Sequence, residues 1–129
     1  GGRRCVPRAG WAGATLIPAP VWRGRLDVFT AVLDPADVAP ASLRTAELTP
    51  MMVQLVAAGR GVAALPDWAL TEYLNLNLLK TVRLGEEGVW RTLYAAVRQG
   101  DGPKAFIQGF MSTAQDHCFQ HLSGVRRAG

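Results

Sequence analysis

Residues 51–70 read MMVQLVAAGRGVAALPDWAL, and this stretch decides the fold class. Its first half carries apolar residues at the spacing of three and four that marks one face of a helix. These residues are Met51, Met52, Leu55, Val56 and Ala58. Pro50 suits the first turn of a helix, and the hydroxyl of Thr49 is a candidate N-cap that accepts a hydrogen bond from a backbone amide. We therefore expect a helix that starts beside Pro50.

A tight turn and a strand follow this helix. Gly59 suits the left-handed conformation that ends a helix, and Gly61 adds a second flexible joint. Residues 62–65, VAAL, form a short apolar run closed by Pro66, which is typical of a strand covered on both faces. Asp67 is expected to cap a second helix. A helix that feeds a buried strand through a short turn is one unit of a layered α/β domain.

Helices and strands alternate along the rest of the chain as well. Further strands are expected at 15–17, where Pro18 and Pro20 stop the ladder, and at 42–48, 78–84 and 90–97. Further helices are expected at 24–33, ended by Asp34-Pro35, at 68–74 and at 104–122, whose apolar side carries Ile107, Phe110, Ala114 and Cys118. Residues 85–88 read as a turn, and residues 1–12 read as an irregular tail. This order predicts a mostly parallel sheet flanked by helices.

The composition is that of a folded domain and excludes several classes of protein. The chain has 129 residues, of which 49% are hydrophobic and 19% charged. We expect no secretory signal, because no apolar stretch follows the N-terminal arginines, and there is no run of the roughly 18 apolar residues that would span a membrane. The net charge is +4, but the terminal arginines carry +5, which leaves −1 for the interior. These are Arg3, Arg4, Arg8, Arg126 and Arg127. We therefore expect no direct contact with DNA and no membrane partner.

Other chemistry has little support in the sequence. Cys5 and Cys118 are far apart and are expected to be reduced thiols of a cytoplasmic protein. His117 and His121 lie one helical turn apart, but ligands from a single terminal helix do not close a metal site, and the helix dipole explains them equally well. The sequence lacks a G-x-S-x-G elbow and a phosphate-binding loop. We therefore predict no metal, no cofactor and no catalytic residue.

The stretch QLVAAGRGVAALP, residues 54–66, resembles the signature of the effector-sensing domain of LysR-type transcriptional regulators. Further segments are similar to the methionine-biosynthesis, or MetR-like, branch of that family. These segments are residues 15–17, 23–29, 67–70, 84–85, 90–98, 116–118 and 122. The resemblance covers roughly residues 13–122, and the motif is specific because it combines a helix, a turn and a strand.

The resemblance implies an α/β fold of the type 2 periplasmic-binding-protein-like kind. Residues 13–92 would be the second lobe, or regulatory subdomain II, and residues 93–122 would be a returning strand and helix of the first lobe, or regulatory subdomain I. Residues 1–12 and 123–129 would be tails. Most of the first lobe and the DNA-binding domain are expected to be absent from the chain, which leaves a partial effector domain.

The resemblance also implies an effector site between the lobes, for a homocysteine-like amino acid. The residues at the matching positions are Ala19, Pro20, Trp22, Arg23, Glu47, Thr49 and Pro50. The amides at a helix N-terminus, the Thr49 hydroxyl and either Arg23 or Arg25 would attract a carboxylate. The alternative is that Thr49 only caps its helix and the arginines are solvated. Ala19 replaces the tyrosine usual in the family, and Trp22 either compensates for that ring or only packs.

Two functions remain open at this point. The first is that of an effector-sensing fragment of a MetR-like regulator; with half of the pocket, it would bind effector weakly. The second is that of a protein-interaction module, which associates with itself or with a regulator subunit. The chain would then be such a module or the remnant of a truncated regulator. The interaction would use the edge of strand 90–97 and the helix face of Phe106, Ile107 and Phe110, because exposed edges and apolar patches favour pairing.

Overall fold

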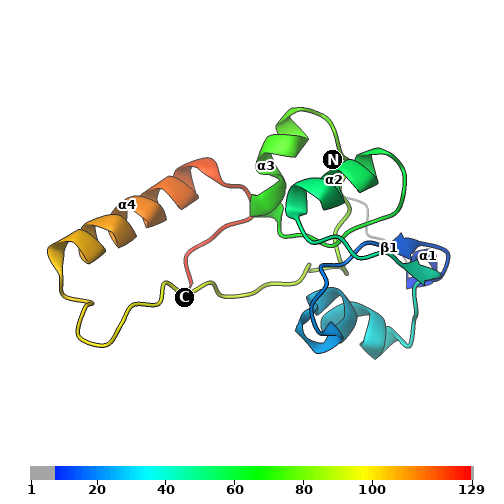
Figure 1. The fold of residues 1–129 in the computed structure, drawn as a ribbon, viewed down its shortest axis with the longest axis horizontal. Coiled ribbons are helices and arrows are strands. Elements are labelled where there is room, and N and C mark those ends of the chain that lie inside the picture. The colour runs from blue at the N-terminus through cyan, green and yellow to red at the C-terminus, as the bar shows by residue number, and fades with distance from the viewer. Residues whose placement is uncertain (1–7, 129) are drawn as a thin grey trace. The chain divides into compact units, whose positions relative to one another are not determined.

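The computed structural model describes residues 8–128, which form two compact units. The first unit runs to Leu65 and includes Glu72–Trp90, and the second contains Pro66–Thr71 and the chain from Arg91 onward. The elements in chain order are α1 (Arg8–Ala12), β1 (Thr15–Leu16), η1 (Arg23–Arg25), η2 (Val28–Leu33), η3 (Asp34–Ala36), β2 (Ser42–Leu43), α2 (Thr49–Ala57), α3 (Asp67–Asn75) and α4 (Ala105–His121) (Figure 1).

A small parallel sheet lies at the centre of the first unit. Strand β1 pairs with β2 in parallel register, with Thr15 opposite Ser42 and Leu16 opposite Leu43. On its other side, β1 forms a single parallel bridge between Leu16 and Val62. The predicted parallel sheet is therefore confirmed, although its strands are much shorter than expected.

Helices cover both faces of this sheet. Leu16 and Ile17 are consecutive, so their side chains point to opposite faces. Leu16 packs in a core cluster with Trp11 of α1 and with Val28, Phe29 and Leu33 of η2. Ile17 packs in a second cluster with Ala46 and with Met52 of α2. This arrangement is the layered α/β architecture predicted from the alternation of elements.

Helix α1 was not predicted, because residues 8–12 were expected to belong to an irregular tail. Five residues are too few to display helical periodicity, and so short a helix is not stable by itself. Its stability comes from tertiary packing, since the Trp11 side chain is only 5% exposed.

The stretch that decided the fold class folds as predicted in its helix and turn. Helix α2 has Pro50 in its first turn, and Gly59 has a φ of 69°. The N-cap prediction for Thr49 is wrong, because Leu48 occupies that position and no side chain caps the helix. Thr49 is instead the first residue of α2. Helix α3 begins at Asp67, one residue before the predicted start, so Asp67 is its first residue and not its cap.

The expectation of a strand at 62–65 enclosed on both faces is wrong in part. Only Val62 forms a bridge, its side chain is 38% exposed, and residues 63–65 are half-buried. Hydrogen bonds join Val62 to β1 on one side, from the Ile17 amide to the Val62 carbonyl at 2.8 Å and from the Val62 amide to the Thr15 carbonyl at 2.9 Å. Within residues 8–128 no strand pairs with its other side, so it is an edge and not a central strand.

The expected helix at 24–33 is helical but not a single α-helix. It consists of the 3₁₀-helix η1, the π-helix η2 and the 3₁₀-helix η3. Leu26 is extended and separates η1 from η2. The predicted end at Asp34-Pro35 is also wrong, because Pro35 occupies the first turn of η3, where a missing amide hydrogen costs little. Asp37, with a φ of 52°, ends the helical segment instead.

Three further predicted strands differ from the structure. The strand at 42–48 is limited to β2. The segment 78–84 has only a single bridge residue, Arg83, and 90–97 has no β-structure. Apolar and β-branched residues favour a strand only where a neighbouring ladder is available to pair with it. The turn at 85–88 is confirmed, with positive φ at Gly85 and Gly88.

Helix α4 is confirmed almost to the residue, with Lys104 as its N-cap and Leu122 as its C-cap. None of its residues is buried. Within the second unit, the segment after α4 meets the start of α3, where the Thr71 and Ser123 hydroxyls are 3.2 Å apart. In the part of the chain that the structure describes, no helix has both the length and the apolar character that a membrane span requires.

Candidate functional site

The predicted effector site lies at one edge of the parallel sheet. Because β1 and β2 are parallel, their carboxyl ends meet at the same edge, which is where open α/β sheets bind ligands. The last hydrogen bond between the two chain segments joins the Ala46 amide to the Pro18 carbonyl at 3.1 Å. The loops 19–23 and 47–50 begin directly after it. The backbones of the predicted site residues therefore leave the sheet at neighbouring points.

The side chains of these two loops do not all converge. Ala19 and Thr49 are half-buried, whereas Pro20, Glu47 and Pro50 are exposed. Thr49 and Pro50 occupy the first turn of α2, where backbone amides have no partner within the helix.

The Trp22 ring lies against the turn that follows it. Its side chain is 76% exposed, and its ring lies so close to Gly24 that a β-carbon on residue 24 would be 2.6 Å from it. The ring therefore covers the η1 backbone.

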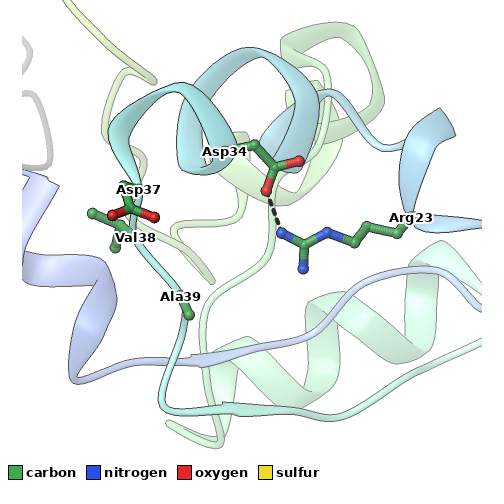
Figure 2. Close-up of a pocket in the computed structure, with 5 residues that line it drawn as sticks. All are labelled: Arg23, Asp34, Asp37, Val38 and Ala39. Atoms are coloured by element: carbon green, nitrogen blue, oxygen red, sulfur yellow. Dashed lines mark hydrogen bonds and ion pairs between the residues drawn. The ribbon is translucent and has the colours of Figure 1, made fainter.

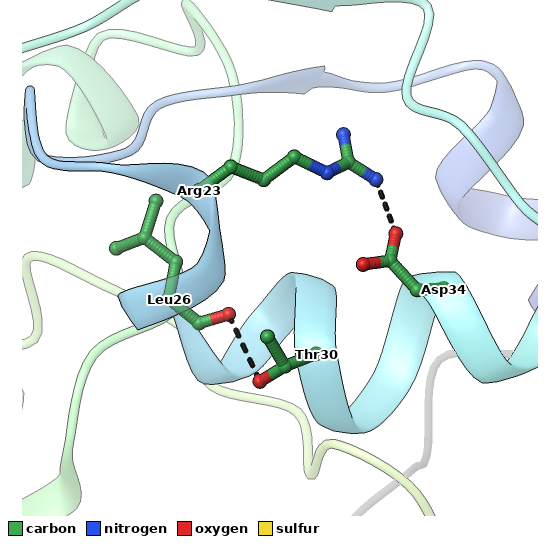
Figure 3. Close-up of polar contacts among 4 residues, drawn as sticks. All are labelled: Arg23, Leu26, Thr30 and Asp34. Atoms are coloured by element: carbon green, nitrogen blue, oxygen red, sulfur yellow. Dashed lines mark hydrogen bonds and ion pairs between the residues drawn. The ribbon is translucent and has the colours of Figure 1, made fainter.

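Arg23 is directed away from its own loop and toward the helical segment that follows it. Its guanidinium forms an ion pair with Asp34 and lies over the Phe29 ring, 4.1 Å from the ring centroid (Figure 3). The same view shows that the hydroxyl of Thr30, a residue of η2, donates to the Leu26 carbonyl at 3.4 Å. Arg23 therefore has protein partners and is not simply solvated, but none of these contacts brings it to Thr49. Arg25 is exposed.

The Arg23 side chain helps to line a surface hollow. The hollow has a volume of about 340 Å³ and is lined by Arg23, Asp34, Asp37, Val38 and Ala39 (Figure 2). Of these residues, the sequence predicted only Arg23 as part of a site. Of the acidic residues on the two sides of Pro35, the sequence analysis interpreted only Asp34, as part of the end of a helix.

The C-terminal helix carries the other groups considered as ligands. The rings of His117 and His121 lie 4.3 Å apart between centroids. Among residues 8–128, no group of three or more histidine, cysteine or acidic side chains is arranged to hold a metal. Cys118 is a half-buried free thiol, and Cys5 lies outside the described residues.

Comparison with protein families identifies the chain. The family described as the LysR substrate binding domain matches residues 2–119. The chain is 42% identical over 117 residues to the HTH-type transcriptional regulator MetR of Salmonella typhimurium, and equally similar to that of Escherichia coli K12. It is 35% identical over 111 residues to MetR of Haemophilus influenzae. These relatives are transcriptional regulators and not enzymes.

The length covered in these relatives is limited. The alignment includes 91% of this chain but only 36% of the Salmonella and Escherichia proteins, so the chain spans about a third of their length.

A solved structure agrees with this relationship. The regulatory domain of MetR, a LysR family regulator from N. meningitidis, superposes with a TM-score of 0.78 at 33% identity, over 95% of this chain and 56% of that one. The periplasmic-binding-protein-like fold expected from the sequence is thereby confirmed. Its mutant form gives a TM-score of 0.76. The chain belongs to the LysR substrate-binding domain family, and its relatives are MetR-like transcriptional regulators.

Proposed function

We propose that this chain senses a small effector as part of a MetR-like LysR-type regulator in the cytoplasm. Residues 13–92 supply the second lobe of the effector domain, and residues 93–122 supply the strand and helix that return to the first lobe. The effector is a homocysteine-like amino acid held between the lobes. The family membership and the similarity to MetR regulators support this proposal.

One observation carries the proposal. The parallel strands β1 and β2 direct the loop 19–23 and the N-terminus of α2 to the same sheet edge, with the bond between Ala46 and Pro18 at its border. The first-turn amides of α2 carry a partial positive charge that favours a carboxylate. Thr49, half-buried beside these amides, adds a hydroxyl.

The affinity of the chain on its own is expected to be low. A small ligand is fixed by polar groups that converge on it from several sides, and the matched length is a third of a whole regulator. We predict a dissociation constant for homocysteine of about 1 mM or weaker, which corresponds to about 4 kcal/mol or less of binding free energy.

The test is a titration of the ¹⁵N-labelled chain with homocysteine, followed by amide chemical shifts. We expect the largest shifts at residues 19–23 and 47–52. Thr49→Val should weaken binding several-fold, because it removes a hydroxyl at the proposed site. Thr113→Val, which removes an exposed hydroxyl from α4, is the matched control and should change nothing. Shifts confined to other residues would contradict the proposed site.

A second candidate function, that of a self-association or subunit-binding module, is favoured by exposed apolar side chains of the second unit. Leu93 and Tyr94 are 86% and 83% exposed in a segment without secondary structure. Phe106 and Phe110 of α4 are 70% and 74% exposed. Large apolar side chains gathered on one part of a protein commonly mark an interaction surface.

Sedimentation velocity at several concentrations tests this second function. If the module self-associates, the average mass should rise with concentration, and the double substitution Leu93→Ser with Phe110→Ser should shift association to higher concentration. The control is Leu76→Ser, which removes a 64% exposed leucine from the first unit. A monomer at all concentrations would speak against self-association.

A further inference from the structure

Residues 92–97 of the second unit are suited to a β-strand but have no strand partner. Residues 91–98 are neither helix nor strand (Figure 1), and all of them are exposed. Within residues 8–128, the amides and carbonyls of 92–97 form no backbone hydrogen bond. The segment reads TLYAAV, without a charge, a proline or a glycine. Thr92, Tyr94 and Val97 are of the residue types that strands favour.

An uncharged, strand-forming segment with unpaired backbone groups is a template for pairing with another chain. Its larger side chains are accessible, since Leu93, Tyr94 and Val97 are 86%, 83% and 44% exposed. We propose that 92–97 pairs with the same segment of a second copy of this chain, as an antiparallel two-stranded ribbon centred on Ala95. The inference rests on the second candidate function, because it gives self-association a strand partner and a register.

Two arginines flank the segment and limit how two copies can pair. Like charges directly opposite each other destabilise a pair of strands. Parallel pairing in register would place Arg91 beside Arg91 and Arg98 beside Arg98. Antiparallel pairing centred between Tyr94 and Ala95 would place Arg91 opposite Arg98. Antiparallel pairing centred on Ala95 itself places Arg98 opposite Thr92 of the second copy, so no two arginines are opposed.

The register centred on Ala95 also brings apolar side chains together. Leu93 of each copy lies opposite Val97 of the other, and Ala95 lies opposite itself. Because successive side chains of a strand alternate between its faces, these residues of both copies share one face and lose water together. A register centred on Tyr94 would instead place Arg91 opposite Val97. Two strands alone form a marginal pair, so the dimer is expected only at high protein concentration.

The experiment traps the pair with a disulfide, in the whole chain carrying Cys5→Ser and Cys118→Ser. The Cα atoms of directly opposite residues in antiparallel strands are about 4.5–5.5 Å apart, and a disulfide spans about 4.4–6.8 Å. Ala95→Cys should therefore give a covalent dimer on mild oxidation, measured by non-reducing electrophoresis. Ala96→Cys is the matched control. It lies opposite Tyr94 and not opposite itself, so it should give several-fold less dimer.

A second pair of variants tests the backbone hydrogen bonds by sedimentation velocity. Consecutive amides of a strand point to opposite edges, so Ala95→Pro with Ala96→Pro removes a donor from whichever edge pairs. It should raise the concentration needed for association about tenfold or more. Ala95→Thr with Ala96→Thr keeps both amides and should retain association. Because 92–97 form no backbone hydrogen bond within residues 8–128, the prolines remove none from the single chain.

The outcomes separate this inference from the function on which it rests. If the chain associates but Ala95→Cys cross-links no more than Ala96→Cys, self-association uses another surface and the inference is wrong. Equal association of the proline and threonine variants also overturns it. If the chain stays monomeric at every concentration and Ala95→Cys does not cross-link, both the inference and self-association are wrong. Circular dichroism of each variant shows whether the fold is retained.

Discussion

A β-carbon on residue 61 would lie 2.5 Å from the backbone carbonyl oxygen of Thr15, so Gly61 and Thr15 approach more closely than any other residue type would allow. The same oxygen accepts a hydrogen bond from the Val62 amide at 2.9 Å. The side chain of Ile17 would lie 3.0 Å from the same β-carbon, so a second group occupies the space beside Gly61. Gly61 is therefore required by contact with β1.

Substitution of the two glycines of the G-x-G turn should have unequal effects. Gly61→Ala forces a methyl group against β1 and should lower the free energy of unfolding by about 1–3 kcal/mol. Gly59→Asn should cost clearly less, because the space around Gly59 is open and asparagine tolerates its φ of 69°. Urea unfolding of both variants measures the difference. Equal losses would show that the contact with Thr15 is not what requires Gly61.

Trp11 should matter far more to stability than Trp22. Trp11→Ala empties part of the core cluster of β1 and η2 and should lower the free energy of unfolding by about 3–5 kcal/mol. Trp22→Ala, at a 76% exposed position, should change it by about 0.5 kcal/mol or less. Thermal unfolding checks both. A small loss for Trp11→Ala would mean that α1 does not contribute to the core.

Helix α4 should become more helical when its internal glycine is replaced. Gly109 has open space at its β-carbon position, so Gly109→Ala adds no clash. It should stabilise the helix by about 0.5–1 kcal/mol because alanine loses less backbone entropy. Circular dichroism at the helical minimum should show a stronger signal. Ala114→Gly is the inverse control, and a gain in helicity from it would contradict the reasoning.

The ion pair between Arg23 and Asp34 should be weak. Both side chains are about half exposed, so solvent screens their attraction. A double-mutant cycle with Arg23→Gln and Asp34→Asn should give a coupling free energy of about 0.2–1 kcal/mol that falls with added salt. A coupling well above this range would mean that Arg23 is locked in the pair and is not available to a ligand.

The site residues were harder to predict than the elements that carry them. The resemblance indicated residues 19–23 and 47–50 as site segments, and the parallel sheet brings their backbones to one edge. The sequence did not predict that the Arg23 side chain turns toward Asp34, because the break at Leu26 between η1 and η2 leaves no trace in the hydrophobic pattern. The left-handed backbone of Asp37, which ends η3, was not predicted either, because it depends on the turn that follows.

Helices α2, α3 and α4, the turn glycines and the alternation of helices and strands could be predicted from the amino-acid sequence. These features depend on helical spacing and on the backbone restrictions of proline and glycine, which act within a few residues. Contacts between distant segments explain why Trp11 completes the core, why 62–65 is an edge, and why 90–97 is not a strand. A strand exists only when another segment supplies its hydrogen bonds, and that partner is distant in the sequence.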